Sequence, residues 1–309
     1  MREVSDKRLG PAGNTAAVAT AAAASRLAVN NFSVVKILAQ TGSINVGPIW
    51  SHYWIMRNMG TSGLGRGALV GAARAAPHYA IAFSVYDRMA KEYVEESGFG
   101  AGYLSLAAVY GAGFTAGLTA QAVTHPLDLI KVRLVTQPPG QPWYRGAVDC
   151  FSKVMAQEGL YRGLYRGFGV SVLGAASFWA DYFAIWELTD RIPWRHRRTT
   201  PMFPLEWFFW PLFSFVGAAT LNYPLDVVRR KYMAQGLRLP QEGNTDVKFR
   251  GYYQLVRNTY KCYGLYGFFN GVVSNAFKMT PQLMVFCLTA TLAREVLSGQ
   301  RKAERRLSF

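Results

Sequence analysis

The chain has 309 residues, the length of two average soluble domains or of one helical membrane domain. Hydrophobic residues make up 50% of it, yet the mean hydropathy is only +0.05, which is too low for a bundle of uniformly apolar spans. We therefore expect helices with small and polar residues around a wet cavity. The net charge of +16 indicates an anionic partner, such as nucleic acid, an anionic lipid or an anionic solute.

The distribution of residue types argues against several functions. Lys and Arg are scattered and form no basic stripe interleaved with aromatics, so we expect no nucleic-acid partner. Three cysteines and four histidines show no ligand spacing, which argues against a disulfide framework and against a metal site. No nucleophile–base pair is evident, so we expect neither an enzyme nor a cofactor. The N-terminus lacks the continuous apolar core of a secretory signal.

Six long segments follow one another along the chain, each with about twenty residues that could cross a bilayer. In chain order they run over 13–42, 67–93, 104–137, 168–190, 205–236 and 272–297. The first contains the run TAAVATAAAA, whose small side chains suit close helix packing in membranes. Most of the charge lies between the segments, which predicts spans joined by polar connections.

A motif recurs with a period of roughly one hundred residues, the first sign of an internal repeat. The second and third copies read PLDLIK and PLDVVR, and their bases Lys131 and Arg229 are 98 residues apart. The first copy reads NFSVVK and ends at Lys36, 95 residues before Lys131. Asn31 and Ser33 replace the Pro and the Asp there, so only the base remains.

Two glycine markers have the same period. Pairs of glycines 13 residues apart bound a short amphipathic segment in each copy: Gly47 and Gly60, Gly146 and Gly159, Gly251 and Gly264. A turn ending in glycine then follows, at Gly67, Gly167 and Gly271. Each repeat therefore reads as a long helix, a short surface helix and a second long helix. The repeats cover about 13–95, 104–192 and 204–298 of one domain, 1–309.

Six spans in three repeats with the motif P-x-[D/E]-x-x-[K/R] resemble the mitochondrial carrier family over nearly the whole chain. GLYRGFGVSVLGAASFWADYF and YPLDVVRRKYMAQ are similar to segments of the ADP/ATP carriers, although Lys231 replaces an Arg and only Met233 keeps a Met place. Carriers of coenzyme A or ATP-Mg have similar third-repeat motifs. The resemblance implies an all-α, multi-pass protein of the mitochondrial inner membrane. It would have six transmembrane helices in three pseudo-symmetric repeats, each with a short matrix-side amphipathic helix.

The repeated motif places a helix breaker and a pair of charges in an apolar segment. Pro126 and Pro224 remove a backbone donor, so we expect them to bend their helices. Asp128 and Asp226 each precede a base by three residues and share a helix face with it. Because charges inside a membrane are costly unless they are paired or wet, we interpret the motif as a breakable ion-pair gate at the matrix mouth. The alternative is a permanent helix-packing device.

The resemblance implies which gate charges meet. Two ion pairs are expected, Asp128 with Arg229 and Asp226 with Lys36. Lys131 loses its acid partner because Ser33 stands in the acid position. Asn31 is expected to remove the bend of the first helix, and Gln40 matches a glutamine that braces the gate in the family.

The opposite gate lacks its bases. Carriers have an acid followed three residues later by a base near the end of each second helix. Here Asp87 is followed at that spacing by Ala90, and Glu187 by Asp190, while the third repeat has alanines in both places. We expect no ion-pair lock on the intermembrane-space side.

The resemblance also implies a central binding site. Its residues would be Arg26, Arg74, Gly174, Ala175, Phe178, Tyr182, Asn222 and Lys278. The three bases favour a polyphosphate through charge-assisted hydrogen bonds. Each could instead be a helix-end residue or a lipid-facing side chain that snorkels to the interface. The aromatic residues could equally be packing.

Two turns resemble the family's cardiolipin-binding turns. They are Tyr165-Arg166-Gly167 and the weaker copy that ends at Gly271. Backbone N–H groups at a helix N-terminus suit a phosphate head group, so cardiolipin is an expected bound lipid. Simple helix initiation is the alternative.

Two functions remain open. In the first, the protein exchanges an anionic solute, an adenine nucleotide or a related anion, by alternating access. In the second, it is a carrier-derived structural subunit of a respiratory-chain complex or supercomplex that no longer transports. The bases of the binding site favour transport, and the incomplete gates favour the structural subunit.

Overall fold

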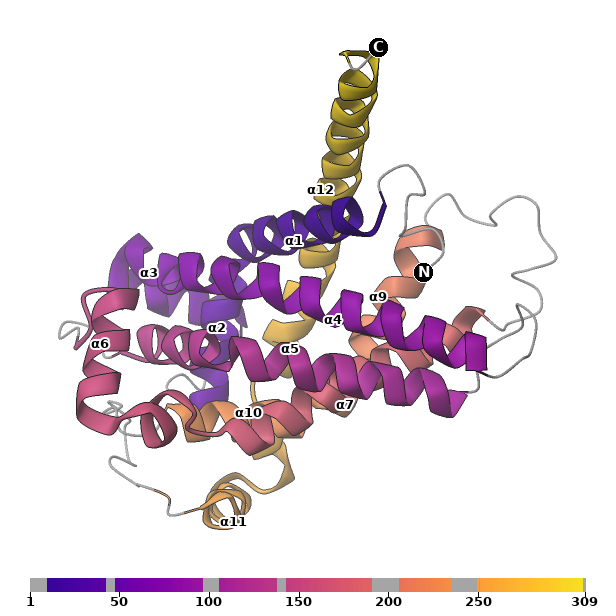
Figure 1. Ribbon diagram of the computed structural model, residues 1–309. Helices are drawn as coiled ribbons and strands as arrows, with labels where there is room; N and C mark the ends of the chain where they lie inside the picture. Colours follow the sequence, from indigo (N-terminus) through magenta and orange to yellow (C-terminus); the bar gives the residue numbers. More distant parts are fainter. Residues whose placement is uncertain are drawn as a thin grey trace.

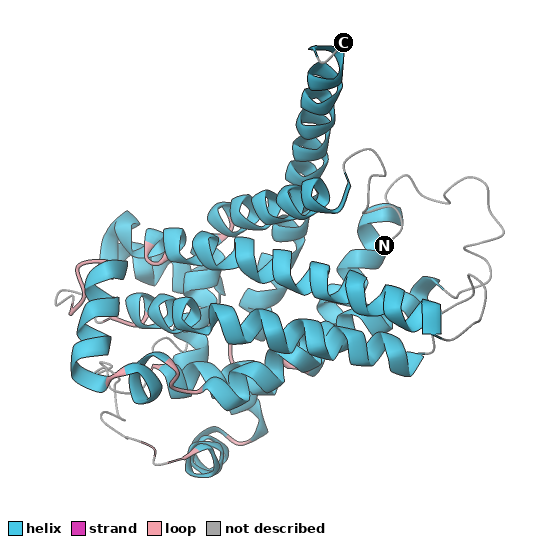
Figure 2. Cartoon of the chain, in the orientation of Figure 1, coloured by secondary structure: helices cyan, strands magenta, loops and turns pink. Residues whose placement is uncertain are grey.

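The computed structural model describes residues 10–42, 48–96, 106–137, 143–190, 206–234, 249 and 251–307. Within these ranges the ordered elements are all helical (Figures 1 and 2). Six spans are formed by α1 Gly10–Ala28 with α2 Asn30–Thr41, α4 Ala68–Glu96, α5 Leu106–Val135, α7 Phe168–Asp190, α9 Glu206–Leu221 with α10 Tyr223–Met233, and α12 Val272–Leu307. The helices that connect the two spans of each repeat, called the short helices below, are α3 Pro48–Gly65, α6 Ala147–Glu158 and α11 Tyr252–Tyr263, with the short helical segments η1 Leu160–Leu164 and η2 Leu265–Phe268.

The six predicted long segments and the three short helices are all present. The segment 13–42 is divided between α1 and α2, and 205–236 between α9 and α10; the other four are single helices. Tertiary contacts join α1 to α4, α4 to α5, α5 to α7, α7 to α9, α9 to α12 and α12 back to α1. The long helices therefore form a closed ring. The end of this ring that carries α3, α6 and α11 is called the short-helix end below (Figure 1).

The glycine markers have a common backbone role in all three repeats. Gly60, Gly159 and Gly264 have φ of 68°, 75° and 61°, and Gly67, Gly167 and Gly271 have φ of 67°, 80° and 82°. Only glycine enters this left-handed region at little steric cost. The first set turns the chain after each short helix, and inside α3 this turn divides the helix in two. The second set directs the chain into the second long helix of each repeat.

A break between helices coincides with the motif proline in only one of the three repeats, and the first repeat, where Asn31 was expected to remove the bend, has a break of its own. The first span is interrupted at Val29 although it lacks the proline, because the Asn30 amide donates to the carbonyl of Leu64 at 2.8 Å and ties the start of α2 to the end of α3. By contrast, α5 runs unbroken across Pro126. Only in the third repeat does the interruption, at Asn222, lie beside the motif proline, Pro224.

Helix α5 packs so closely against α7 that the backbones of the two helices are in van der Waals contact. A Cβ atom built on Gly113 would lie 2.8 Å from the Cα of Ala180, and one on Gly117 would lie 2.7 Å from the Cα of Ala176. Both glycines are buried. Small residues of this kind allow membrane helices to approach closely and gain van der Waals contact, which holds the first two repeats together.

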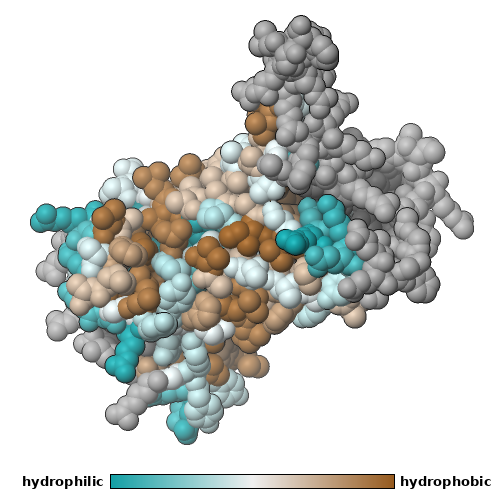
Figure 3. All heavy atoms as spheres, viewed as in Figure 1, coloured by the Kyte–Doolittle hydropathy of each residue, from teal (hydrophilic) through white to brown (hydrophobic). Residues whose placement is uncertain are grey.

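Large apolar side chains are exposed on the outer surface of the spans, while the buried ionised groups lie inside. Three helical stretches, Leu106–Val135, Phe168–Thr189 and Leu265–Ser298, are long and apolar enough to cross a membrane by length and composition. Large apolar side chains such as Val123, Phe213 and Leu288 are exposed, and hydrophobic residues cover much of the middle of the face shown in Figure 3. Buried ionised groups face the interior instead, the arrangement expected of a bundle surrounded by lipid.

We expect Gly117→Ala to lower the thermal unfolding temperature of the purified protein. The added methyl group meets backbone atoms of α7, and overpacking of this kind costs about 1–3 kcal/mol, more than the gain of about 1 kcal/mol in helix propensity. Gly111→Ala is the control on the same helix, because its Cβ would meet only the Tyr93 hydroxyl at 3.9 Å. Equal stability of the two variants would contradict the close packing of α5 on α7.

Candidate functional site

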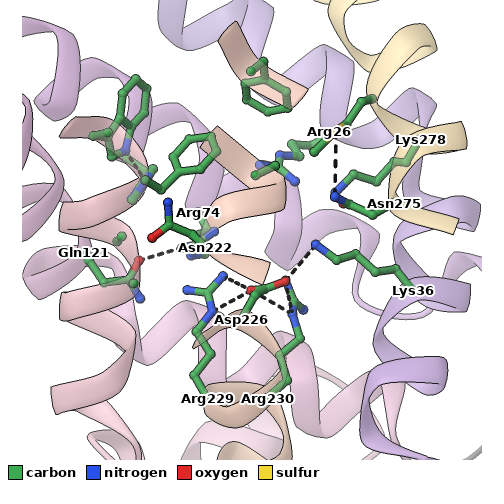
Figure 4. A pocket seen from close by; sticks show the side chains of 18 of the residues that line it. Arg26, Lys36, Arg74, Gln121, Asn222, Asp226, Arg229, Arg230, Asn275 and Lys278 are labelled. Atoms are coloured by element: carbon green, nitrogen blue, oxygen red, sulfur yellow. Dashed lines mark hydrogen bonds and ion pairs between the residues drawn. The ribbon is translucent and has the colours of Figure 1, made fainter. Parts of the chain in front are cut away.

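A cavity lies inside the ring of helices (Figure 4). It comprises about 820 Å³ of empty space, counting the part that is open to solvent. Its lining residues are Arg26, Lys36, Arg74, His78, Tyr79, Gln121, Gly174, Ala175, Phe178, Trp179, Phe215, Ala219, Asn222, Asp226, Arg229, Arg230, Asn275, Lys278 and Met279. All six pseudo-symmetric spans contribute to it.

Asp226 is the centre of the ion pairs at the short-helix end of the cavity. Its carboxylate accepts from Lys36 Nζ at 2.8 Å, from Arg229 at 2.5 Å and from Arg230 Nε at 3.3 Å. Gln40 Nε2 donates to the same carboxylate at 2.9 Å. Figure 4 shows Lys36, Arg229 and Arg230 converging on it. The expected contact between Asp226 and Lys36 therefore forms, and Gln40 does lie against this pair.

Asp128 belongs to the same network. Arg229 Nη1 lies 3.6 Å from its Oδ2, so Arg229 bridges both acids and the second expected pair also forms. Arg74 Nη2 lies 3.5 Å from the same oxygen and donates to Gln121 Oε1 at 2.8 Å. Arg74, which the sequence placed among the solute-binding bases, is therefore already engaged by one acid and one amide.

Lys131 has an amide in place of an acid. Its Nζ lies 3.4 Å from Asn30 Oδ1, and the Asn30 amide in turn donates to backbone carbonyls at the end of α3. A Cβ on Gly71 would collide with Lys131 Nζ, so this glycine makes room for the side chain. The Ser33 hydroxyl donates to its own helix, to the carbonyl of Val29. Asn30 was missed because nothing in the sequence brings it near Lys131.

Arg26 and Lys278 face the cavity without an acid. Lys278 has a relative exposure of only 6%. Among the residues that the structure describes, neither side chain has a hydrogen-bond or ion-pair partner. A buried charge without a partner is costly. This pair is therefore where the cavity has positive charge available for a ligand.

The second and third repeats supply an apolar wall of the cavity, in which Asn222 is a polar residue. Gly174, Ala175 and Phe178 line it as expected, but Tyr182 does not: it packs behind Phe178, with ring centroids 6.5 Å apart. The Asn222 amide lines the cavity but donates to Asp181 Oδ2 at 2.8 Å and to the carbonyl of Ala218.

His78 and Trp179 are cavity residues that the sequence did not indicate. Trp179 Nε1 donates to His78 Nε2 at 3.3 Å, and His78 Nδ1 lies 2.9 Å from the Thr124 hydroxyl. Thr124 donates to the carbonyl of Ala120, so a neutral His78 with its proton on Nδ1 satisfies every partner. These contacts join residues up to 101 positions apart, which no local pattern predicts.

The two glycine turns proposed for lipid binding begin helices. Gly167 and Gly271 directly precede α7 and α12. Arg166 pairs with Glu158 at 3.1 Å, and the same carboxylate takes both guanidinium nitrogens of Arg133 at 2.6 and 2.7 Å. Tyr165 stacks on His125. Arg166 and Tyr165 thus already have protein contacts, and their backbone N–H groups donate to the carbonyls of Gly163 and Leu160. The lipid site at these turns stays a prediction.

At the end opposite the short helices, no ion pair between helices is found in the described residues. Asp87 is exposed, and Ala90 packs against an aromatic cluster. The one ion pair near this end, Arg88 with Glu92, is exposed and lies within α4. The side chain of Asp190 lies outside the described residues.

We expect Asp226→Asn to lower the thermal unfolding temperature strongly. It leaves Lys36, Arg229 and Arg230 close together without their shared acid, and breaking a buried pair in this way costs about 3–5 kcal/mol. Asp149→Asn is the control, because its pair with Lys153 is partly exposed and such pairs contribute about 0–1 kcal/mol. A small effect at both positions would show that the Asp226 network does not hold the helices together.

Comparisons with known proteins agree with this architecture. The chain matches the sequence profile of the family described as "Mitochondrial carrier protein" three times, over residues 7–97, 103–196 and 202–301. It is 31% identical to "Solute carrier family 25 member 43" of Danio rerio over 89% of this chain and 79% of the relative. It is 30% identical to "ADP/ATP translocase 4" of Mus musculus over 87% and 85%. It is 27% identical to "Mitochondrial adenine nucleotide transporter ADNT1" of Arabidopsis thaliana over 88% and 83%.

Three matches in succession account for the three repeats and for the closed ring of six long helices. Members of this family are transporters of the mitochondrial inner membrane that carry anionic solutes such as nucleotides. The chain belongs to the mitochondrial carrier family.

Proposed function

We propose that the protein is an antiporter of adenine nucleotides in the mitochondrial inner membrane. The observation that carries this proposal is the pair Arg26 and Lys278, two cavity bases without a partner in the described residues, one of them almost fully buried. Two relatives named for adenine-nucleotide or ADP/ATP transport match most of the chain, which supports the same solute.

The charge of the cavity fits a solute with several negative charges. Its basic lining residues are Arg26, Lys36, Arg74, Arg229, Arg230 and Lys278. Asp226 is the acid in the lining, and Asp128 lies behind it in contact with Arg74 and Arg229. The excess of positive charge favours a polyphosphate, which can accept charge-assisted hydrogen bonds from several bases at once.

The position of the bases suggests how binding and opening are coupled. Lys36 and Arg229 line the cavity and also hold the ion pairs at the short-helix end. A phosphate group that reaches them competes with Asp226 and Asp128, and so weakens the contacts that close this end. A ligand shifts such an equilibrium only by its differential affinity for the two states, which the shared bases provide.

The aromatic wall supplies the second half of the recognition. Phe178, Trp179 and Phe215 line the cavity beside Gly174 and Ala175, where the absence of large side chains leaves room for a planar ring. A purine fits such a wall by stacking. Cardiolipin, bound at the turns that precede α7 and α12, is the lipid that we propose to accompany this function.

A second candidate function rests on the incomplete gates. Lys131 faces an amide instead of an acid, and at the opposite end no repeat has a base three residues after the acid position. A structural subunit of a respiratory-chain complex does not need either closure. This second candidate predicts that the folded protein co-purifies with partner subunits and does not exchange solutes.

The two candidates are separated by ADP/ATP exchange of the purified protein in cardiolipin-containing liposomes. We expect exchange, and we expect Lys278→Ala to reduce its rate at least tenfold, because one buried charge-assisted contact is worth about 1.5–3 kcal/mol. Lys153→Ala, on the surface helix α6, is the control and should exchange normally. Arg26→Ala should resemble Lys278→Ala.

The solute class is tested by adding coenzyme A or inorganic phosphate as a competitor to the exchange assay. We expect inorganic phosphate, which lacks the purine, to inhibit less than unlabelled ADP. Inhibition by coenzyme A but not by ADP would replace the adenine nucleotide by a larger adenine-containing anion. Absence of any exchange from folded, cardiolipin-stabilised protein would contradict transport and favour the structural subunit.

A further inference from the structure

Aromatic rings cross the interior of the bundle beyond the basic residues. Tyr79 of α4 contacts Trp179 of α7, with centroids 5.5 Å apart, and Phe286 of α12, at 5.9 Å. Phe178 of α7 contacts Trp179 at 5.9 Å and Phe215 of α9 at 5.4 Å. The rings of Phe286, Tyr79, Trp179, Phe178 and Phe215 are called the aromatic series below. In the ring of helices α4 is separated from α12 by α1 and from α7 by α5. These ring contacts therefore join helices across the interior and not merely along its wall.

Trp179 is the centre of this series. Its indole contacts the rings of Tyr79, Phe83, Phe178, Tyr182, Phe183 and His78. Within the described residues, Trp179 is the only ring of the series whose orientation is fixed by a hydrogen bond. This bond runs from its Nε1 to His78. His78 is in turn held by Thr124 of α5. The orientation of Trp179 is thus set by two neighbouring helices.

The series lies on the side of the bases that faces away from the short helices. Tyr79 is five residues beyond Arg74 on α4, which is about 7.5 Å along the axis, and Phe286 is eight residues beyond Lys278 on α12, about 12 Å. Beyond it, Tyr86 and Phe183 stack with centroids 3.6 Å apart. A solute that enters from this end must pass the rings before it reaches Arg26 or Lys278.

We propose that this aromatic series is the barrier of the cavity at the end opposite the short helices, where no repeat has a base three residues after the acid position. The rings carry no net charge and few hydrogen-bonding groups to replace the water around an ion, so they oppose the passage of a hydrated anion wherever they meet. Ring contacts tolerate offset-stacked and edge-to-face geometries, so the barrier can open by side-chain and helix movement without separating charges. His78 is its positioning residue, because it holds Trp179.

The barrier is incomplete in this structure. Within the described residues no ring of α7 or α9 contacts a ring of α12, so the series is open between Phe215 and Phe286. This agrees with a cavity that is partly open to solvent while its short-helix end is closed by ion pairs. Movement of α12 toward α7 would complete the series.

The test measures access to the cavity by thiol labelling. Ala219→Cys lines the cavity on α9 and serves as the reporter, in a background with Cys262→Ser and Cys287→Ser. Cys150 can stay, because burial raises the pKa of its thiol to about 11 and keeps it unreactive. A bulky, membrane-impermeant maleimide is added to the protein in liposomes, and the labelling rate is followed without nucleotide.

Because the series is open in this structure and is completed only when α12 moves toward α7, removal of a ring acts on the closed fraction of the protein. We expect Trp179→Ala and Phe286→Ala to raise the labelling rate at least twofold, which corresponds to a parent that is closed at least half of the time. Phe213→Ala is the matched control on α9, an exposed ring whose aromatic contact is with Trp210 and not with the series, and its rate should not change. Trp179→Phe keeps a ring and should stay near the parent rate. His78→Ala should raise the rate in the parent and add nothing to Trp179→Ala.

Equal labelling rates in Trp179→Ala, Phe286→Ala and Phe213→Ala would overturn the barrier. If Trp179→Ala does not fold, Phe286→Ala decides, because it removes a ring at the edge of the series. The labelling requires no transported solute, so its outcome is independent of the exchange assay. A protein that exchanges nothing can still show the barrier, and one that exchanges ADP can lack it.

Discussion

The arrangement of the whole bundle depends on one buried carboxylate, that of Asp226. It accepts from Lys36 on α2 and from Arg229 and Arg230 on its own helix, and Arg229 continues to Asp128 on α5. Asp226, Arg229 and Asp128 therefore tie together a helix from each of the three repeats. Because Lys131 has only an amide as its partner, the network has two acids to three motif bases. The short-helix end is consequently closed by two carboxylates that several bases share, and not by three separate ion pairs.

The three repeats share a backbone but not a chemistry. In each repeat, one residue stands two positions after the motif base and a second stands just before the glycine that follows the short helix. These pairs are Leu38 and Met59, Arg133 and Glu158, and Lys231 and Tyr263. Leu38 and Met59 belong to one apolar cluster, Arg133 and Glu158 form a bidentate ion pair, and Lys231 lies over the Tyr263 ring at 5.2 Å. Each pair joins a gate helix to the short helix of its repeat. The link in the second repeat is the most directional, so we expect that repeat to move most nearly as a rigid unit.

Sequence reasoning succeeded where the determinant is local or repeated. Glycines that must adopt positive φ recur at one spacing, so the repeats were predictable from the sequence. The two ion pairs between helices were expected from the family resemblance, because the spacing of acid and base alone does not say which helices meet. It failed where a contact joins distant positions. Asn30 interrupts the first helix through Leu64 and also replaces the missing acid for Lys131, and Trp179 depends on His78, 101 residues away. Pro126 lies inside a continuous α5, so a motif proline did not by itself indicate where a helix divides.

In the proposed mechanism the two ends of the cavity close by different kinds of interaction, ion pairs at the short-helix end and aromatic contacts at the other, and this affects how a solute can act on each. The bases that close the short-helix end also line the cavity, so an entering anion competes directly with Asp226 and Asp128 and loosens that end. The aromatic rings at the other end carry no net charge, and an anion has no strong contact by which to loosen them; they yield only when the helices that carry them move. Arg26 and Lys278 lie between and belong to neither closure. A bound anion could thus remain held by these two bases while one end gives way and the other forms.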